Sequence, residues 1–362
     1  MTTMHEEPGK AAPGSLALVQ ALVNTQYGQG RRAHVELTSP EQLRTWLVAH
    51  RLLADDMPVT QEDLENTKKE KRMQIGVHFP QYEMSADPRP IREYARTVEN
   101  LGYKHIIAYD HVLGADPTHR PGWTGYTDKH LFHEPLVLFG YLAALTQLEL
   151  VTAVIILPQR QTALVAKQAT EVDVLSGGKF RLGVGIGWNP VEYEALGMDF
   201  HTRGRVIEEQ IEVLRLLWSK EIVSYRGHFH TIVEAGLNPL PTRRAIPIWL
   251  GGSSEKALRR VARVADGWMP LGEPDESMRV TLAHLRTWTT EAGRDPATLG
   301  IEARINASSG DSRAWVYQTE AWQALGATHI SFNTMEAGYT SLDQHLEALR
   351  TYAEAVKPLE GR

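Results

Sequence analysis

The chain has 362 residues, of which 42% are hydrophobic and 23% are charged, a composition typical of a globular protein with a sizeable core. Its net charge of −6 argues against a nucleic-acid-binding surface, and its lack of cysteine excludes disulfides, thiolate zinc sites and cysteine nucleophiles. The start of the chain lacks the layout of a secretory signal, and no apolar run reaches membrane length, so we expect a cytoplasmic protein without a membrane partner.

Residues 1–72 are predicted to form a separate extension, partly disordered, with short helices. Ser39-Pro40-Glu41-Gln42 combines an N-cap serine, a proline at the first helical position and a glutamine at the third, and it predicts a helix to about Leu53. Thr60 opens a second capping pattern. Acidic and basic residues nearly balance here, so there is no basic stripe for a nucleic acid.

The segment from Leu16 to Leu53 resembles the start of a class of bacterial stress-regulator proteins. Those proteins carry a cysteine-containing zinc motif further along, and this chain has no cysteine. We therefore interpret residues 1–72 as a small helical appendage. A cofactor-binding regulatory protein that uses this segment is the alternative from another functional class.

From residue 73 onward, predicted strands and helices alternate. The predicted strands are 74–79, 104–109, 151–157, 179–186, 246–250, 267–270, 301–305 and 329–332. The predicted helices are 91–101, 135–146, 165–175, 203–218, 255–264, 277–292, 314–325 and 342–356, and a hairpin is predicted over 222–232. Eight strand–helix pairs predict an α/β protein with a (β/α)8 TIM barrel over residues 73–362, whose chemistry lies where strands end. A doubly wound open sheet is the alternative, but the first strand lacks the Gly-rich turn that such a fold requires.

Several short motifs follow these strands in a fixed order. They are Asp110-His111-Val112, Glu134-Pro135-Leu136, Leu157-Pro158-Gln159-Arg160, Leu175-Ser176-Gly177-Gly178, Gly183–Trp188, Ile248–Gly252 and Asp266-Gly267-Trp268. Together they resemble the luciferase-like monooxygenase superfamily, in the branch of coenzyme F420-dependent oxidoreductases. The resemblance spans residues 73–335 and implies a barrel enzyme that often forms homodimers.

Two residues are the catalytic candidates. Asp110 and His111 close the second predicted strand, where a carboxylate and an imidazole can hydrogen-bond a ring carbonyl or move a proton. The resemblance implies that both face the cofactor ring. We expect His111 to manage the proton and Asp110 to orient the ring edge or to hold the imidazole tautomer. The alternative is an aspartate that caps the loop beside a solvent-facing histidine.

Glycine-rich strand ends are the cofactor-binding candidates. Gly185 and Gly187 would let a planar ring approach the backbone, and Trp188 either lines the pocket or belongs to the core. The residues Gly251, Gly252 and Ser253 precede a helix, an arrangement that suits the cofactor phosphate, although they also suit a simple turn. The resemblance further implies a non-proline cis peptide at Ala153-Val154 that supports the ring.

The sequence therefore predicts hydride transfer between F420 and a small organic substrate. A reduced-FMN monooxygenase on the same fold is the alternative. Arg160, Arg203 and Arg205 favour F420, because its tail is polyanionic and these arginines lie in loops expected at the open face of the barrel. No metal site is predicted, because His228 and His230 share a hairpin face without a third ligand.

Overall fold

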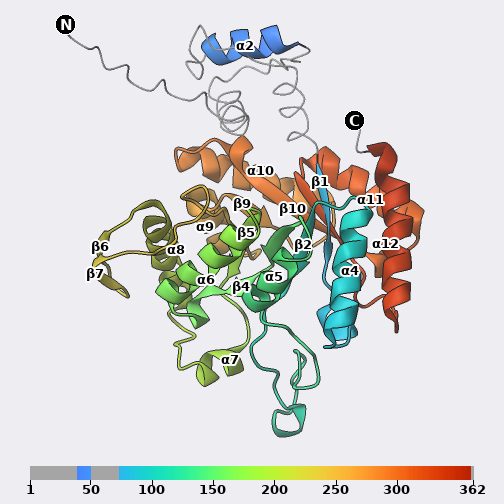
Figure 1. Cartoon of the computed structure of the whole chain (residues 1–362), viewed down its shortest axis with the longest axis horizontal. Coiled ribbons are helices and arrows are strands. Elements are labelled where there is room, and N and C mark those ends of the chain that lie inside the picture. Colours follow the sequence, from blue (N-terminus) through green and yellow to red (C-terminus); the bar gives the residue numbers. More distant parts are fainter. Residues whose placement is uncertain (1–38, 50–72, 360–362) are drawn as a thin grey trace, which may run out of the picture. The chain divides into compact units, whose positions relative to one another are not determined.

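The computed structural model describes residues 39–49 and 73–359 of the chain (Figure 1). The chain divides between Arg72 and Met73 into two compact units, and each is described by itself. In the first unit, helix α2 (Pro40–Ala49) begins as predicted, since the Oγ atom of Ser39 accepts a hydrogen bond from the Gln42 amide at 3.2 Å. The predicted end of this helix near Leu53 and the capping pattern at Thr60 lie outside the described residues.

The second unit contains a closed barrel of parallel strands. Its strands are β1 (Gln74–His78), β2 (His105–Ala108), β3 (Glu149–Thr152), β4 (Ile155–Ile156), β5 (Phe180–Gly185), β8 (Ile248–Gly251), β9 (Gly267–Met269), β10 (Gly300–Asn306) and β11 (His329–Asn333). The first and last strands pair in parallel and close the sheet, while β3 and β4 share one position in the ring. The predicted (β/α)8 barrel is confirmed, and the open doubly wound sheet is wrong because β1 and β11 leave no edge.

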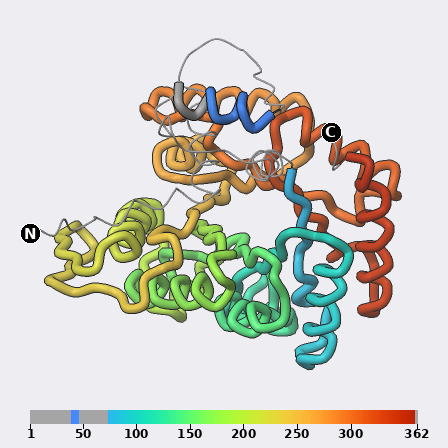
Figure 2. The backbone as a smooth tube through the Cα atoms, turned by 45° about the horizontal axis from the view of Figure 1, so that its top comes forward, coloured from blue at the N-terminus to red at the C-terminus, as the bar shows by residue number. Residues whose placement is uncertain are grey.

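Helices connect these strands and surround them (Figures 1 and 2). They are α4 (Pro88–Asn100), α5 (Pro135–Ala143), α6 (Thr162–Leu175), α7 (Pro190–Ala195), α8 (Arg203–Ser219), α9 (Glu255–Val264), α10 (Glu276–Glu291), α11 (Ser312–Leu325) and α12 (Leu342–Val356). The predicted hairpin is present as β6 (Val223–Arg226) and β7 (Thr231–Ala235), and it lies beside α8 at the periphery (Figure 1). Among the described residues, no helix is both long and apolar enough to span a bilayer.

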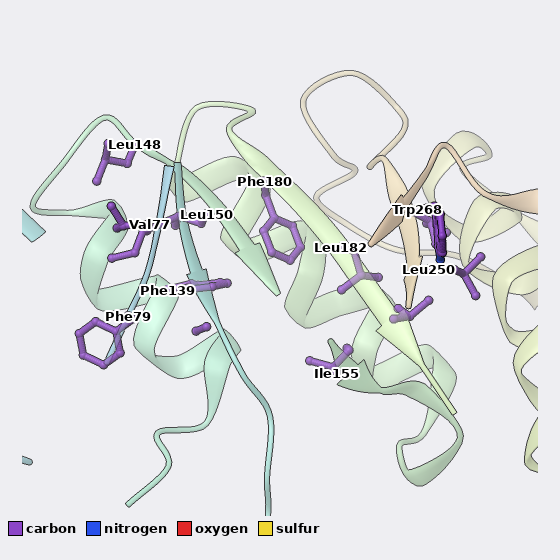
Figure 3. Packing of buried hydrophobic residues seen from close by; sticks show 14 of the residues in the cluster. Val77, Phe79, Phe139, Leu148, Leu150, Ile155, Phe180, Leu182, Leu250 and Trp268 are labelled. Carbon is purple, nitrogen blue, oxygen red and sulfur yellow. The ribbon is translucent and has the colours of Figure 1, made fainter. Parts of the chain in front are cut away.

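The core lies between the strands and the surrounding helices. In β5, Phe180, Leu182 and Val184 belong to the main hydrophobic cluster, and the ring of Phe180 lies 6.2 Å from that of Phe139 on α5 (Figure 3). The alternate residues of β5, from Arg181 to Gly185, face the barrel interior because successive side chains of a strand point to opposite faces. This alternation lets one strand serve the core on its outside and a site on its inside.

Three local features differ from the sequence predictions. Helix α4 starts three residues before Ile91, because Asp87 caps it by accepting from the Arg89 amide at 2.9 Å. The predicted strand 151–157 is interrupted at Ala153-Val154, where the non-proline cis peptide that the resemblance implies is confirmed. The connection after β5 contains the unpredicted short helix α7, which Asn189 caps at 3.0 Å.

Candidate active site

A cavity of about 550 Å³ opens at the carboxyl ends of the barrel strands. Its lining includes the last residues of β1, β5, β8, β9, β10 and β11, together with residues that directly follow β2 and β3. This is the face on which (β/α)8 barrels carry their chemistry, because eight strand ends and their loops converge there. The cavity is therefore the candidate active site.

Two walls of different character face this cavity. We call the first the glycine wall, which consists of Ala153, Val154, Gly185, Gly187, Gly251 and Gly252. We call the second the polar wall, which consists of His78, Tyr109, Arg304, Asn306, Ser331 and Asn333. The glycine wall comes from β4, β5, β8 and the residues beside them, and the polar wall from β1, β10, β11 and the residue after β2.

Asp110 lines the cavity, but both oxygens of its carboxylate accept hydrogen bonds from residues that follow or belong to β4. Its Oδ1 atom accepts from Arg160 at 2.8 Å and its Oδ2 atom accepts from the Ile156 amide at 3.1 Å. Arg160 also pairs with Glu134 at 2.9 Å and is not among the residues that line the cavity. The structure thus places Asp110 and Arg160 in one buried ion pair, and the expected role of Asp110 in holding the His111 tautomer is wrong.

His111 is instead held by Glu192 on the unpredicted helix α7. The Glu192 Oε1 atom lies 3.3 Å from the His111 Nδ1 atom and accepts from the amides of Val112 and Leu113 at 2.7 and 3.3 Å. Burial would raise the pKa of Glu192, but the bond to His111 and the two backbone amides outweigh it and lower the pKa. An ionised Glu192 selects the imidazole tautomer with the proton on Nδ1, which leaves Nε2 as the acceptor.

Aromatic rings surround His111. The centroid of its ring lies 4.7 Å from that of Tyr126, 4.8 Å from that of Phe132 and 5.9 Å from that of Trp188. Trp188 lines the cavity with half of its surface exposed, so it belongs to the pocket rim and not to the core. These rings restrict the motion of the imidazole and keep water away from it.

Two positions of the glycine wall require glycine because the Val154 side chain packs close to them. A Cβ atom on Gly185 would lie 2.6 Å from the Val154 side chain, and one on Gly251 would lie 3.3 Å from it. These glycines therefore make room for Val154, which in turn presents its side chain to the cavity. The expectation that the glycines directly admit a planar ring needs this correction: protein atoms already fill the space beside Gly185.

The predicted phosphate site forms one end of the cavity. Gly252 has a φ of 110°, which favours glycine, and Ser254 caps α9 by accepting from the Ala257 amide at 3.3 Å. Gly251, Gly252 and Ser254 line the cavity, whereas Ser253 does not. The neighbouring Arg260 donates to the Gly204 carbonyl at 2.9 Å, which brings the start of α8 to the same end.

The sequence reasoning missed the polar wall, although a signal for it was present. In β10 the polar residues Glu302, Arg304 and Asn306 alternate with apolar ones, and in β11 Ser331 and Asn333 do the same. The barrel register pairs Arg304 with Ser331 and Asn306 with Asn333, so polar residues of both strands share the inner face. Alternation in a strand of a parallel barrel indicates an interior that is polar rather than packed.

A layer of buried charge closes the barrel beneath the cavity. Arg181 donates to Glu302 at 2.8 Å and to Glu149 at 2.9 Å, and its guanidinium lies 4.2 Å from the centre of the Trp249 ring. His105 lies 3.0 Å from the other oxygen of Glu302. Burial would raise the pKa of Glu302, but His105 and Arg181 outweigh it and lower the pKa. We call this layer the barrel floor.

One of the two hairpin histidines has polar partners on neighbouring elements. His230 pairs with Glu209 at 2.9 Å and contacts Thr162 at 2.6 Å. Within residues 39–49 and 73–359, no group of three His, Cys, Asp or Glu side chains could hold a metal ion.

The fold and the site define a (β/α)8 barrel with an active-site cavity at the carboxyl face. Residues 72–358 match the family model of the luciferase-like monooxygenases, and the chain belongs to that family. Residues 16–80 match a second model, that of a putative stress-induced transcription regulator.

Known proteins resemble this chain in sequence, and solved structures resemble it in fold. An uncharacterized protein of Mycobacterium tuberculosis is 38% identical over 208 residues, which cover 55% of this chain and 71% of that protein. An FMNH(2)-dependent dimethylsulfone monooxygenase of Pseudomonas fluorescens is 31% identical over 188 residues, which cover 51% of each chain. The coenzyme F420-dependent tetrahydromethanopterin reductase of Methanopyrus kandleri shares the fold with a TM-score of 0.64 at 14% identity, over 80% of this chain and 99% of that one. The monooxygenase RslO1 of Streptomyces bottropensis has a TM-score of 0.66 at 18% identity, over 79% of this chain and 99% of that one.

Proposed function

We propose that this protein is a coenzyme F420-dependent oxidoreductase that transfers a hydride between the deazaflavin and a small organic substrate. When bound, the cofactor would supply the hydride donor or acceptor at its C5 position. The alternative is a reduced-FMN-dependent monooxygenase, which the identity to dimethylsulfone monooxygenases favours.

The observation that carries the proposal is the cationic start of α8, which Arg260 of the cavity lining contacts. Arg260, in the second half of α9, lines the cavity and donates to the Gly204 carbonyl in the first turn of α8. Arg203 and Arg205 lie in the same turn, outside the cavity lining. Arg203 stacks on the Phe200 ring at 3.6 Å, and Arg205 is exposed. Helix N-termini and guanidiniums attract anions, and the tail of F420 carries more negative charges than the single phosphate of FMN.

The glycine wall and His111 give the cofactor ring a place with defined chemistry. Val154 presents an apolar surface on one side of the cavity, and Gly252 and Ser254 lie at the end where a phosphate would bind. His111 would take or give one proton at Nε2, since Glu192 occupies Nδ1. The rings of Tyr126 and Trp188 would exclude water from this proton transfer.

A titration of the protein with F420 and with FMN, followed by fluorescence, tests the choice of cofactor. We expect F420 to bind at least tenfold more tightly, a difference of about 1.4 kcal/mol. Arg205→Gln should weaken F420 binding at least threefold and leave FMN binding unchanged. Arg263→Gln on α9 is the matched control, because this exposed arginine is paired with Glu208. Tighter FMN binding, or oxygen consumption with reduced FMN and substrate, would contradict the proposal.

A further inference from the structure

Arg304 stands apart from the other arginines of the cavity because it has no carboxylate partner. The only hydrogen bond of its side chain within the described residues joins Nη1 to the Tyr109 hydroxyl at 3.3 Å. Arg260, which also lines the cavity, is paired with Glu208 at 3.0 Å, and Arg181 below is paired with two glutamates. Among residues 39–49 and 73–359, no carboxylate oxygen lies within 4.0 Å of the Arg304 guanidinium.

A partly buried guanidinium without a counter-ion is costly unless a ligand neutralises it. The two carboxylates that line the cavity near Arg304 are already engaged elsewhere. Glu302 is held by Arg181 and His105 in the barrel floor, and Glu336 accepts from the Tyr82 hydroxyl at 3.0 Å. Arg304 therefore forms no ion pair within the described residues and feels only the longer-range attraction of Glu336, so its donors can serve a molecule that enters the cavity.

The neighbours of Arg304 add hydrogen-bonding capacity to this charge. Ser331 is its register partner on β11, and the Ser331 hydroxyl lies 2.9 Å from the His78 Nε2 atom. The Nδ1 atom of His78 is buried and finds no hydrogen-bond partner in the described part of the chain. One layer above, the Asn333 side-chain Nδ2 donates to the Asn306 side-chain Oδ1 at 3.0 Å.

Aromatic rings lead from this wall to His111. Tyr109, which bonds Arg304, and Tyr126, whose ring centre lies 4.7 Å from that of His111, both line the cavity. An acidic head group at Arg304 would thus allow an apolar body to lie along these rings, with its reacting carbon toward the imidazole.

We propose that Arg304 anchors an anionic substrate, an organic carboxylate whose apolar body lies along Tyr109 and Tyr126 toward His111. The inference rests on the proposed function, since it assigns the polar wall to the substrate and the glycine wall to the cofactor. It names a substrate class: small carboxylates with an aromatic or aliphatic body. The guanidinium binds the carboxylate through paired N–H donors, which a neutral amide cannot match.

Isothermal titration calorimetry with benzoate and benzamide, two probes of nearly equal shape, tests this assignment on the full-length protein with and without saturating F420. Benzoate should bind the wild type at least tenfold more tightly than benzamide. Arg304→Gln should reduce that preference below twofold by weakening benzoate binding alone, and Arg304→Lys should keep at least a threefold preference. Arg260→Gln is the control that removes a cavity arginine with a partner, and it should keep the full preference.

Several results would overturn the assignment. These are equal binding of the two probes by the wild type, a preference that survives in Arg304→Gln, or a preference that Arg260→Gln abolishes. A tenfold loss of F420 affinity in Arg304→Gln would place Arg304 against the cofactor and also overturn it. A wild type that binds benzoate through Arg304 but binds neither F420 nor FMN would instead refute the proposed function alone. If Arg304→Gln fails to fold, the preference for benzoate over benzamide is measured in Arg304→Lys and Arg304→Met instead. Arg304→Lys should keep at least a threefold preference and Arg304→Met should lose it; a preference that survives in Arg304→Met would overturn the assignment.

Discussion

At the scale of single residues, adjacent positions in the chain have unrelated roles. Asp110 and His111 are predicted together because both follow β2, yet their side chains have different partners. Asp110 forms an ion pair with Arg160, whereas His111 contacts Glu192. The sequence could place both residues at the end of a strand. It could not show the partner of His111, because Glu192 lies 81 positions away on a helix of six residues.

Glu192 is expected to act as a positioning residue. Glu192→Gln should lower kcat at least tenfold, because a neutral amide no longer selects the His111 tautomer, while the affinity for cofactor and KM change less than threefold. Glu192→Asp should recover part of the loss. The control is Glu194→Gln, an exposed residue on the same helix. A kcat that stays unchanged in Glu192→Gln, with chemistry shown to limit turnover, would remove Glu192 from this role.

Gly185 illustrates a second limit of sequence reasoning at this scale. Gly185→Ala should destabilise the protein by about 1–3 kcal/mol, since its Cβ would lie 2.6 Å from Val154. Urea unfolding of the single variants and of Gly185→Ala with Val154→Ala measures the coupling between the two positions. We expect the double variant to be more stable than the sum of the single losses indicates; strict additivity would show that the two side chains do not compete for space.

At the scale of elements, two ion pairs of Arg160 join two connections of the barrel, the one between β2 and α5 and the one between β4 and α6. Arg160 follows β4, Asp110 follows β2 and Glu134 caps α5, so their contacts fix these segments together. Apart from the short helix α7, the strands and helices of the barrel were predictable from caps, glycines and apolar periods that each segment carries locally. The ion pairs were not, because they depend on the order of the strands around the barrel.

Arg160→Met should destabilise the protein by about 3–5 kcal/mol in urea unfolding, because it leaves the buried Asp110 carboxylate without its cation. Adding Asp110→Asn should recover part of this loss, since the amide carries no charge. Glu134→Gln is the milder control, because 35% of the Glu134 side chain is exposed. If Arg160→Met keeps its stability but loses affinity for F420, the result would support the expectation from the sequence that Arg160 binds the cofactor.

At the scale of the whole molecule, the barrel interior makes stability depend on pH. Burial, with Arg304 as a second cause, lowers the pKa of His78 to about 3, and burial with Arg181 lowers the pKa of His329 well below 6.5. Below pH 6.5 these histidines are protonated in the unfolded chain but remain neutral in the native protein. The free energy of unfolding therefore falls as the pH falls below 6.5, and these two residues do not change it above that value.

Urea unfolding at pH 7.5, 6.5 and 5.5 measures this dependence. Each of the two histidines should contribute up to about 1.4 kcal/mol per pH unit below 6.5. His78→Asn should flatten the slope, whereas substitution of the exposed His284 by Asn should not. An identical slope in His78→Asn and the wild type would show that His78 is protonated in the native state.

The boundary at residue 72 is the other prediction at this scale. Deletion of residues 1–70 should leave a barrel that unfolds cooperatively and binds F420 with unchanged affinity, since β1 begins at Gln74 and the barrel closes through β11. Urea unfolding and the fluorescence titration check this, and light scattering of both proteins checks the predicted homodimer. Loss of the cooperative transition in the shortened protein would assign residues 1–70 to the fold of the barrel.

The barrel floor has a consequence for the order of events in turnover. Arg181, Glu302 and Trp249 fill the barrel beneath the cavity, so no molecule can leave through the amino ends of the strands. Every ligand that reaches the cavity must then return by the mouth through which it came. Product and substrate share one passage, and the product that still occupies the polar wall blocks the next substrate. Product inhibition should therefore be competitive with respect to substrate, and the rate of departure through the mouth sets an upper limit on turnover.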